Sequence, residues 1–415
     1  MTHPRRTPFW AILTANAISQ MGNQMALVAI PWFVLQTTGS ALSTSLVLVF
    51  TALPMVIAFF IGGALVDRFG ARPMSVLADA LSFVSVAAIP ILFALGWLSL
   101  PVLLALVAFG ALLDAPGNTA RDALMPDLIE RSGYTPQRAN ALTVGVMRVA
   151  VLAGPMIGGL LAALVGVTTV LWVNAATFVF SAAIVALAVP GGKPVAQGGG
   201  LSGSEFTAGL RHIWQDRVLR GLFMMQIANE LLGDALVLVG LPVLASLIAG
   251  QATDLGMMMS AFGLGALAGV TAYGLWRAPV GSRVSILGAG FLLVAGGVTG
   301  LVLTLLSGVG LAGALIAALL FGLGIGPLRP LLATVYQQRT PAALRGRVFG
   351  ARGAFTTLAV PVGALLVGSA IDQLGLAATL GGISGSFGVI ALLVVLTPSL
   401  RSLDLRAPVA EPAGD

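Results

Sequence analysis

Two carboxylates stand four residues apart inside an apolar stretch of this sequence. Glu230 and Asp234 belong to the run Gln226–Pro242, and helical spacing places both on one face, with Gln226 one turn before them. A charged side chain at the centre of a membrane-spanning helix costs about 2.5–3.5 kcal/mol on insertion scales. Desolvation and like charge both favour a bound proton on at least one of the two acids. The spacing therefore predicts that this pair takes up and releases protons.

The composition indicates which elements hold the pair. Hydrophobic residues make up 58% of the 415 and charged residues only 9%, and the mean hydropathy is +1.01. Because soluble domains carry about 25% charged residues, the sequence predicts an integral membrane protein. Hydropathy divides it into about twelve helical spans, the first of them a true span rather than a cleaved signal peptide. Their approximate bounds are 9–35, 42–66, 73–95, 100–120, 139–165, 168–189, 218–248, 255–276, 284–306, 310–334, 348–371 and 376–396.

The basic residues favour one orientation of these spans. They fall in alternate loops, in the two tails or at three helix positions, whereas the opposite loops have only Asp254 and Asp372 near them. The positive-inside rule therefore predicts a multi-pass protein of the cytoplasmic (inner) membrane with both termini in the cytoplasm. The basic loops are expected to hold Arg68, Arg72, Arg121, Arg131, Arg138, Lys193, Arg211, Arg217, Arg220, Arg277, Arg283, Arg339, Arg345 and Arg347.

The same composition argues against several kinds of partner and cofactor. The formal net charge of +6 follows from this loop pattern, so no nucleic acid is expected. The sequence has no cysteine, and its two histidines, His3 and His212, fall in a tail and a loop, so no metal site is predicted. A phosphate-binding loop of the form G-x-x-x-x-G-K-[ST] is missing from the sequence, which disfavours ATP as the energy source. The expected energy source is a proton gradient, with no cofactor.

The two halves of the sequence repeat. A shift of 211 residues lays Asn23 over Asp234, Pro31 over Pro242 and Pro116 over Pro327. The sequence therefore predicts an all-α membrane protein of twelve transmembrane helices in two pseudo-symmetric six-helix bundles. The expected parts are an N-terminal half, a cytoplasmic linker with an amphipathic helix starting near Ser204, a C-terminal half and a cytoplasmic tail, at 1–189, 190–217, 218–397 and 398–415.

A charged motif lies at the turn between the second and third spans. It consists of Gly63, Asp67, Arg68, Gly70 and Arg72. The motif resembles the signature of the major facilitator superfamily, although Ala71 stands where that family has an arginine. The resemblance implies the major facilitator fold, in which Asp67 latches the two halves near the start of the eleventh span in the outward-open state. It also implies that the arginines meet an acid at the end of the fourth span, which Asp122 could supply.

A second motif lies in the fifth span. Gly154, Pro155, Gly158 and Gly159 combine a helix-bending proline with a smooth glycine face. The motif is similar to the core of the one that marks the antiporter subgroup of the superfamily, and a simple packing surface is the alternative. Phe206-Thr-Ala-Gly-Leu-Arg and Arg345-Gly-Arg-Val resemble the branch of twelve-span drug:proton antiporters that includes macrolide-efflux proteins and the enterobactin exporter.

The resemblance implies that the first, fourth, seventh and tenth spans line a central cavity. The candidate substrate residues there are Asn16, Gln20, Asn23, Gln226, Asp114 and Arg148. Arg148 could neutralise Asp114 or an acid of the seventh span, or it could contact an anionic substrate. Hydrogen bonding between helices, without substrate contact, is the alternative for the polar stripe of the first span, and a structural ion pair is the alternative for Arg148.

These observations favour a secondary active transporter that exports a small amphiphilic or cationic compound, of the multidrug or siderophore type, by proton-coupled alternating access. It is expected to work as a monomer among membrane lipids. An importer or facilitator on the same fold is one alternative, and a lipid or lysolipid flippase is another. An intramembrane protease is disfavoured, because its two acids usually stand on facing helices. The protein is therefore not expected to be an enzyme.

Overall fold

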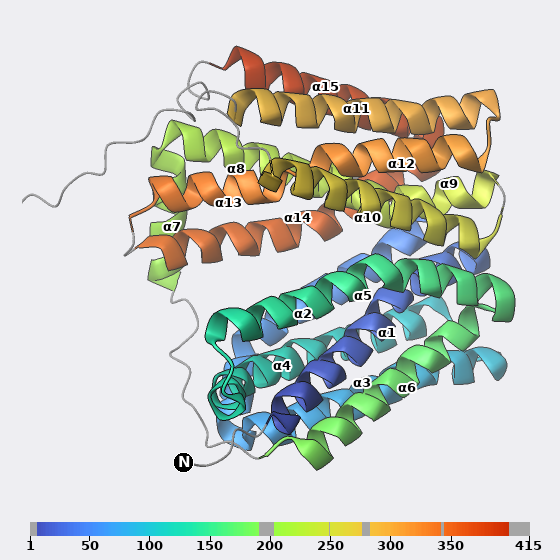
Figure 1. Cartoon of the computed structure of the whole chain (residues 1–415). Coiled ribbons are helices and arrows are strands. Elements are labelled where there is room, and N and C mark those ends of the chain that lie inside the picture. Colours follow the sequence, from blue (N-terminus) through green and yellow to red (C-terminus); the bar gives the residue numbers. More distant parts are fainter. Residues whose placement is uncertain (1–5, 191–202, 249, 276–282, 342–343, 398–415) are drawn as a thin grey trace, which may run out of the picture. The chain divides into compact units, whose positions relative to one another are not determined.

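The chain is built from helices that match the predicted spans. A computed structural model describes residues 6–190, 203–248, 250–275, 283–341 and 344–397 (Figure 1). Within these ranges, 11 stretches are long and apolar enough to cross a membrane by length and composition. The twelfth predicted span is α1 (Thr7–Thr38), whose polar stripe lowers its hydropathy. The predicted all-α fold of twelve spans is confirmed.

The first half contains six long helices. Glycine ends several of them, and Gly70 joins α2 to α3 with φ of 84°, a value that L side chains rarely adopt. The remaining helices of this half are α2 (Ala41–Phe69), α3 (Ala71–Ala94), α4 (Leu100–Ser132), α5 (Pro136–Val165) and α6 (Val167–Ala188).

The second half begins with a short helix, α7 (Gly203–Gln215), where the sequence predicts an amphipathic helix. Two of its six spans are composite. The seventh span joins α8 (Arg217–Asn229), η1 (Glu230–Asp234), η2 (Leu236–Gly240) and α9 (Leu241–Ile248), and the tenth joins α12 (Leu311–Ile325) and α13 (Leu328–Arg339). The other four are α10 (Ala252–Leu275), α11 (Arg283–Ser307), α14 (Arg345–Leu374) and α15 (Leu376–Leu396).

The helices pack into two compact units that interleave along the chain. Unit 1 contains Met1–Gly200, Ala235–Ser260 and Val360–Gln373. Unit 2 contains Leu201–Asp234, Ala261–Ala359 and Leu374–Asp415. Parts of the seventh, eighth and eleventh spans therefore pack with the first six helices. The predicted boundaries of the two halves stay a prediction.

Hydrogen bonds at the end of α14 help to hold unit 1 together. The Asp372 carboxylate accepts hydrogen bonds from Ser40 Oγ at 2.8 Å and from the amides of Ala41 and Leu42 at 3.0 and 3.1 Å. The first amides of a helix have no partner within the helix, so a carboxylate there satisfies them and interacts favourably with the helix dipole. A residue distant in sequence thus caps α2.

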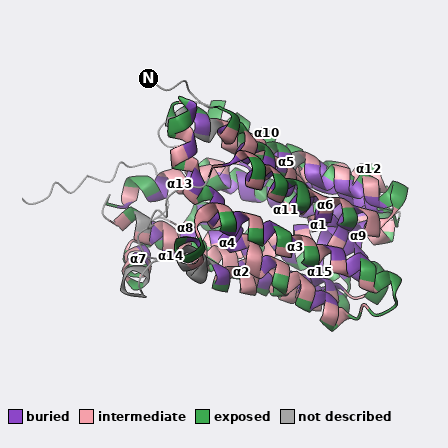
Figure 2. Ribbon diagram, turned by 90° about the horizontal axis from the view of Figure 1, so that it is seen from below, coloured by how far each residue is buried: buried purple, intermediate pink, exposed green. Residues whose placement is uncertain are grey.

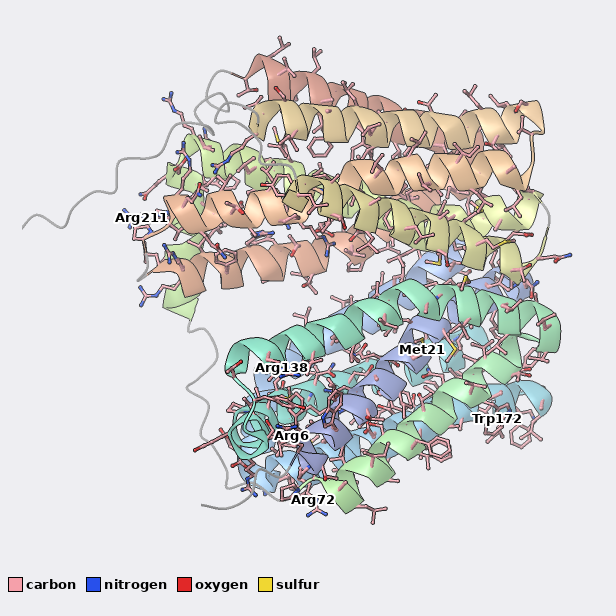
Figure 3. All side chains as sticks on the ribbon, viewed as in Figure 1. Arg6, Met21, Arg72, Arg138, Trp172 and Arg211 are labelled. Carbon is pink, nitrogen blue, oxygen red and sulfur yellow. The ribbon has the colours of Figure 1, made fainter. Side chains whose placement is uncertain are left out.

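Apolar side chains cover the outside of the helices. Leu187, Leu275 and Trp97 are 87%, 79% and 71% exposed, and Figure 2 shows exposed residues along most of the helices. Such surfaces suit a lipid environment, because water would leave them unfavourably hydrated. In unit 1, Figure 3 shows Arg6, Arg72 and Arg138 at one end of the helices and Trp172 at the other. This arrangement agrees with loops that are basic on one side of the membrane.

Candidate functional site

The two acids of the seventh span lie on a local change of helix type. The sequence predicts a continuous α-helix, but Glu230–Asp234 and Leu236–Gly240 form π-helical turns. A π turn is one residue wider than an α turn, is rare in proteins and is frequently found at functional sites. Gly233 and Gly240 stand within these turns, where a residue without Cβ adapts readily to an altered backbone. Both acids remain on the same side of the span.

Arg329 bridges the two acids. Its Nη2 lies 3.3 Å from Glu230 Oε2 and 3.0 Å from Asp234 Oδ2. The exposed fractions of the side chains rise from 5% for Glu230 through 24% for Asp234 to 64% for Arg329. Two carboxylates therefore share one guanidinium, with the first acid buried and the second partly accessible.

A break in the tenth span positions Arg329. The helix α12 ends at Ile325 and α13 begins at Leu328, with Pro327 between them. Proline has no amide hydrogen to donate and its ring disfavours a helix through its own position. Arg329 consequently stands in the first turn of a new helix, where it meets η1.

A second arginine joins the same site from α14. Arg352 Nε donates to Gln226 Oε1 at 2.6 Å, and its guanidinium lies 4.9 Å from the centroid of the Tyr336 ring. Tyr336 is buried and donates to the carbonyl of Leu219 at 3.3 Å. Among the described carboxylates, none forms an ion pair with Arg352. Gln226, Glu230, Asp234, Arg329 and Arg352 are called the acidic site below.

The acidic site contains three of the residues singled out in the sequence and two that were given no functional role. Gln226, Glu230 and Asp234 lie together as predicted. Arg329 and Arg352 are two of the three basic residues that the loop pattern leaves within helices, where a structural ion pair or a side chain extended toward the membrane interface is the ordinary expectation. The pair Gly326-Pro327, just upstream of Arg329 in an otherwise apolar span, is the sequence signal that could have indicated a broken helix there.

The other cavity candidates lie in unit 1. Asn16, Gln20 and Asn23 are partly exposed along α1. Asp114 faces α3, where it accepts a hydrogen bond from Ser82 Oγ at 3.3 Å. The backbone of Arg148 belongs to α5, but its side chain lies outside the described part of the structure. The expected pairing of Arg148 with Asp114 therefore stays a prediction, whereas the acids of the seventh span pair with Arg329.

The assignment of Arg121 to a cytoplasmic loop is wrong. The helix α4 continues to Ser132, well past its predicted end, so Arg121 lies within it and is 5% exposed. It forms a buried ion pair with Asp79 of α3, and Ser181 of α6 donates to the same carboxylate at 2.7 Å. A buried charge requires such partners, which is why the arginine points inward.

The charged motif at the turn between α2 and α3 makes different contacts from those that the family resemblance implies. Asp67 and Arg68 are exposed, and the guanidinium of Arg68 lies 5.6 Å from the Phe69 ring centroid. Arg72 donates to the carbonyl of Ala186 in α6 instead of pairing with Asp122, and among the described residues no ion pair reaches Asp122. The environment of Gly63 lies outside the described part. The latch role of this motif stays a prediction.

The glycines of α5 form a close packing surface. A Cβ on Gly154 would lie 2.4 Å from Gln24 Cβ, and one on Gly158 would lie 2.8 Å from Met25 Cα, so this face touches α1. A Cβ on Gly159 would lie 2.7 Å from the Cα of Gly256 in α10, and the carbonyl of Pro155 also approaches Gly256. The motif therefore serves as a packing surface in this structure, and the part in conformational gating that its resemblance to the antiporter motif suggests stays a prediction.

Comparison with known sequences identifies relatives over nearly the whole chain. The family described as "Transmembrane secretion effector" matches residues 3–412. The multidrug efflux pump Tap of Mycolicibacterium fortuitum is 35% identical over 415 residues, covering 98% of this chain and 100% of the relative. The enterobactin exporter EntS of Citrobacter koseri is 28% identical over 422 residues, covering 99% and 96%.

Solved structures share the fold at low sequence identity. The nucleoside transporter NupG superposes with a TM-score of 0.73 at 10% identity, covering 93% of this chain and 98% of the other. A D-xylose–proton symporter superposes with a TM-score of 0.70 at 15% identity, covering 93% and 97%. These findings confirm the predicted resemblance to major facilitator transporters and to their efflux branch. The chain belongs to the transmembrane secretion effector family of the major facilitator superfamily.

Proposed function

We propose that this protein exports a small amphiphilic or cationic compound in exchange for protons, by alternating access. The observation that carries the proposal is the bridge from Arg329 to Glu230 and Asp234. With both acids ionised, these three side chains carry one surplus negative charge. Either a proton or a cationic substrate can neutralise that charge, and the two compete for it. Such competition is the basis of exchange.

The difference in burial between Glu230 and Asp234 supports an order in which the two acids meet a proton or a substrate. Asp234 is partly exposed and can meet a proton or a substrate first, while Glu230 is buried beside it. Protonation of either acid weakens its hold on Arg329, which frees the guanidinium to reorient. A substrate cation arriving at the protonated pair displaces the proton, because like charges near a buried site repel.

The relatives support export as the direction and an amphiphilic compound as the class of cargo. One is named a multidrug efflux pump and another an enterobactin exporter. In this proposal Gln226, Asn16, Gln20, Asn23, Asp114 and Arg148 line the substrate cavity, while the motifs of α2 and α5 act as gates. The protein works as a monomer in the inner membrane, with both termini in the cytoplasm and no cofactor besides the proton gradient.

Transport into inside-out vesicles tests the proposal. Ethidium, a cationic amphiphile, serves as the probe, and an acid vesicle interior supplies the gradient. Glu230→Gln and Asp234→Asn are each expected to lower the initial rate of accumulation by about tenfold, equivalent to roughly 1.4 kcal/mol. Asp127→Asn is the matched control, because Asp127 forms an exposed ion pair with Arg131 outside the site.

Three results would contradict this proposal. Full gradient-driven accumulation in both acid variants would remove the coupling role from the pair. Uptake in the opposite direction would indicate an importer or facilitator. Phospholipid movement without a gradient, unaffected by both substitutions, would indicate a flippase.

A further inference from the structure

A cavity lies in unit 2, beside α7. It has a volume of about 650 Å³, and α7, α8 and α14 contribute its walls. From α7 come Leu210, Arg211 and Trp214, which follow one another at spacings that place them along one side of the helix. Phe223 and Met224 of α8 and Phe355 of α14 stand opposite. None of these side chains belongs to the acidic site.

Aromatic rings form the body of this cavity. The Trp214 and Phe223 rings meet edge to face with centroids 6.3 Å apart, and Phe223 meets Phe355 in the same way at 5.6 Å. Trp214, Met224 and Phe355 are nevertheless 49%, 44% and 37% exposed. Large apolar side chains that stay exposed in a concave surface are typical of a binding site for an apolar group.

The lining of the cavity includes positive charge. Arg211 is exposed and is the one charged side chain among the described residues that line the cavity. Figure 3 labels it at the end of unit 2 formed by α7. Arg217 and Arg220 are also exposed nearby, and Arg220 Nη1 donates to the Trp214 carbonyl at 3.4 Å. The cavity therefore combines an apolar lining with one arginine in its wall and two more arginines close by in the chain.

One acidic residue, Asp216, stabilises the turn between α7 and α8. Asp216 accepts hydrogen bonds from the amides of Val218 and Leu219 at 2.7 and 3.2 Å, which caps α8. It also pairs with Arg339 of α13 at 3.3 Å. Within α7 itself, a Cβ on Gly209 would lie 2.2 Å from the carbonyl oxygen of Arg347, so α7 contacts the start of α14 directly. These contacts hold the wall of the cavity in place without a ligand.

We propose that this cavity binds an anionic phospholipid of the cytoplasmic leaflet. An acyl chain lies between the rings of Trp214, Phe223 and Phe355, and the phosphate meets Arg211. A cationic amphiphile would be repelled by Arg211, and a zwitterionic phospholipid offers no net charge to it. The amphipathic α7, on the predicted cytoplasmic side, stands at the level where phospholipid phosphates occur. The proposal does not depend on the transported substrate or on protons.

Quenching of Trp214 fluorescence by brominated phospholipids tests the proposal. The full-length protein is reconstituted into bilayers that contain increasing fractions of dibrominated phosphatidylglycerol or dibrominated phosphatidylcholine. The contribution of Trp214 is the difference between the protein and its Trp214→Phe variant. One basic residue near an anionic lipid contributes about 1 kcal/mol, so phosphatidylglycerol should reach half-quenching at about a fivefold lower fraction than phosphatidylcholine.

Two variants separate the site from general surface charge. Arg211→Gln should remove the preference for phosphatidylglycerol, while Arg131→Gln, at an exposed position of unit 1, should retain it. Equal quenching of Trp214 by the two lipids would overturn the proposal, and so would a preference that survives Arg211→Gln. A preference lost equally in Arg131→Gln would also overturn it, because the effect would then reflect net charge alone.

Discussion

At the scale of single residues, Arg329 defines what the two acids of the seventh span can do. A guanidinium between two carboxylates favours ionisation of one acid and leaves the second without a full partner. The acidic site is therefore a three-charge cluster rather than an isolated acid pair. Charge balance at this cluster, more than the identity of either acid, is expected to control transport.

Removal of Arg329 tests charge balance directly. Arg329→Gln leaves Glu230 and Asp234 without their cation, so gradient-driven ethidium accumulation should fall by about tenfold. Combining Arg329→Gln with Asp234→Asn restores the balance and should recover part of the rate. Arg131→Gln serves as the control for arginine removal. A double variant no faster than Arg329→Gln would contradict the charge-balance explanation.

The ion pair between Asp79 and Arg121 is expected to be structural. Both side chains are almost fully buried, with 4% and 6% exposed, so removal of one leaves the other charged and unpaired. Arg121→Met should lower the free energy of unfolding by about 3–5 kcal/mol. Replacing both, as Asp79→Leu with Arg121→Met, should cost less than the single change. Thermal unfolding followed by intrinsic tryptophan fluorescence measures both, and a double variant less stable than Arg121→Met would contradict this role.

At the scale of helices, the backbones of the two halves differ at positions that the repeat makes equivalent. The first span, α1, is a continuous α-helix, whereas its repeat partner contains the π turns of η1 and η2. Pro116 lies within a continuous α4, but the equivalent Pro327 separates α12 from α13. Both irregular helices belong to the second half, and both contribute to the acidic site. The irregular backbone is what brings Arg329 to the two acids.

Close packing between helices predicts a contrast between two glycines of α5. Gly158→Ala should lower the melting temperature, because the new Cβ would lie 2.8 Å from the backbone of Met25. Gly145 has open space around it within 4 Å, so Gly145→Ala should be neutral or stabilise by up to about 1 kcal/mol through helix propensity. Tryptophan-detected thermal unfolding compares the two. Equal melting temperatures would indicate that α5 moves away from α1 at little cost.

At the scale of the whole molecule, the natural absence of cysteine makes the predicted orientation testable. Glu130 lies in the last turn of α4 and Ser307 ends α11. Both residues are exposed, and they lie on opposite predicted sides of the membrane. In intact cells, a membrane-impermeant maleimide should label Ser307→Cys and should label Glu130→Cys only after lysis. The reverse pattern would contradict the positive-inside assignment. Labelling of both would indicate a leaky membrane, which an unsubstituted protein and a cytoplasmic marker control for.

The asymmetry between the halves also belongs to this scale. The repeat places Asn23 of α1 where Asp234 stands in the second half, so only the second half supplies charge at that position. The first half instead buries its charges between α3 and α4, as the Asp79–Arg121 pair. The structure thus separates a structural ion pair in unit 1 from the candidate coupling site in unit 2.

The spans, the repeat and the acid pair could be predicted from the sequence, because hydropathy and helical spacing are local properties. Glu230, Asp234 and Gln226 stand on one face through backbone geometry alone. The family resemblance rested on short motifs that are contiguous in the chain, and the comparisons confirm it.

The partners of the charges depended on the tertiary structure. Arg329 is 99 residues from Glu230, and Arg352 is 126 residues from Gln226, so no local pattern indicates that they meet. The inward direction of Arg121 required the unpredicted extension of α4 and the approach of α3 and α6. Hydropathy shows where a charge is costly, but only the packing of distant helices decides which charge relieves that cost.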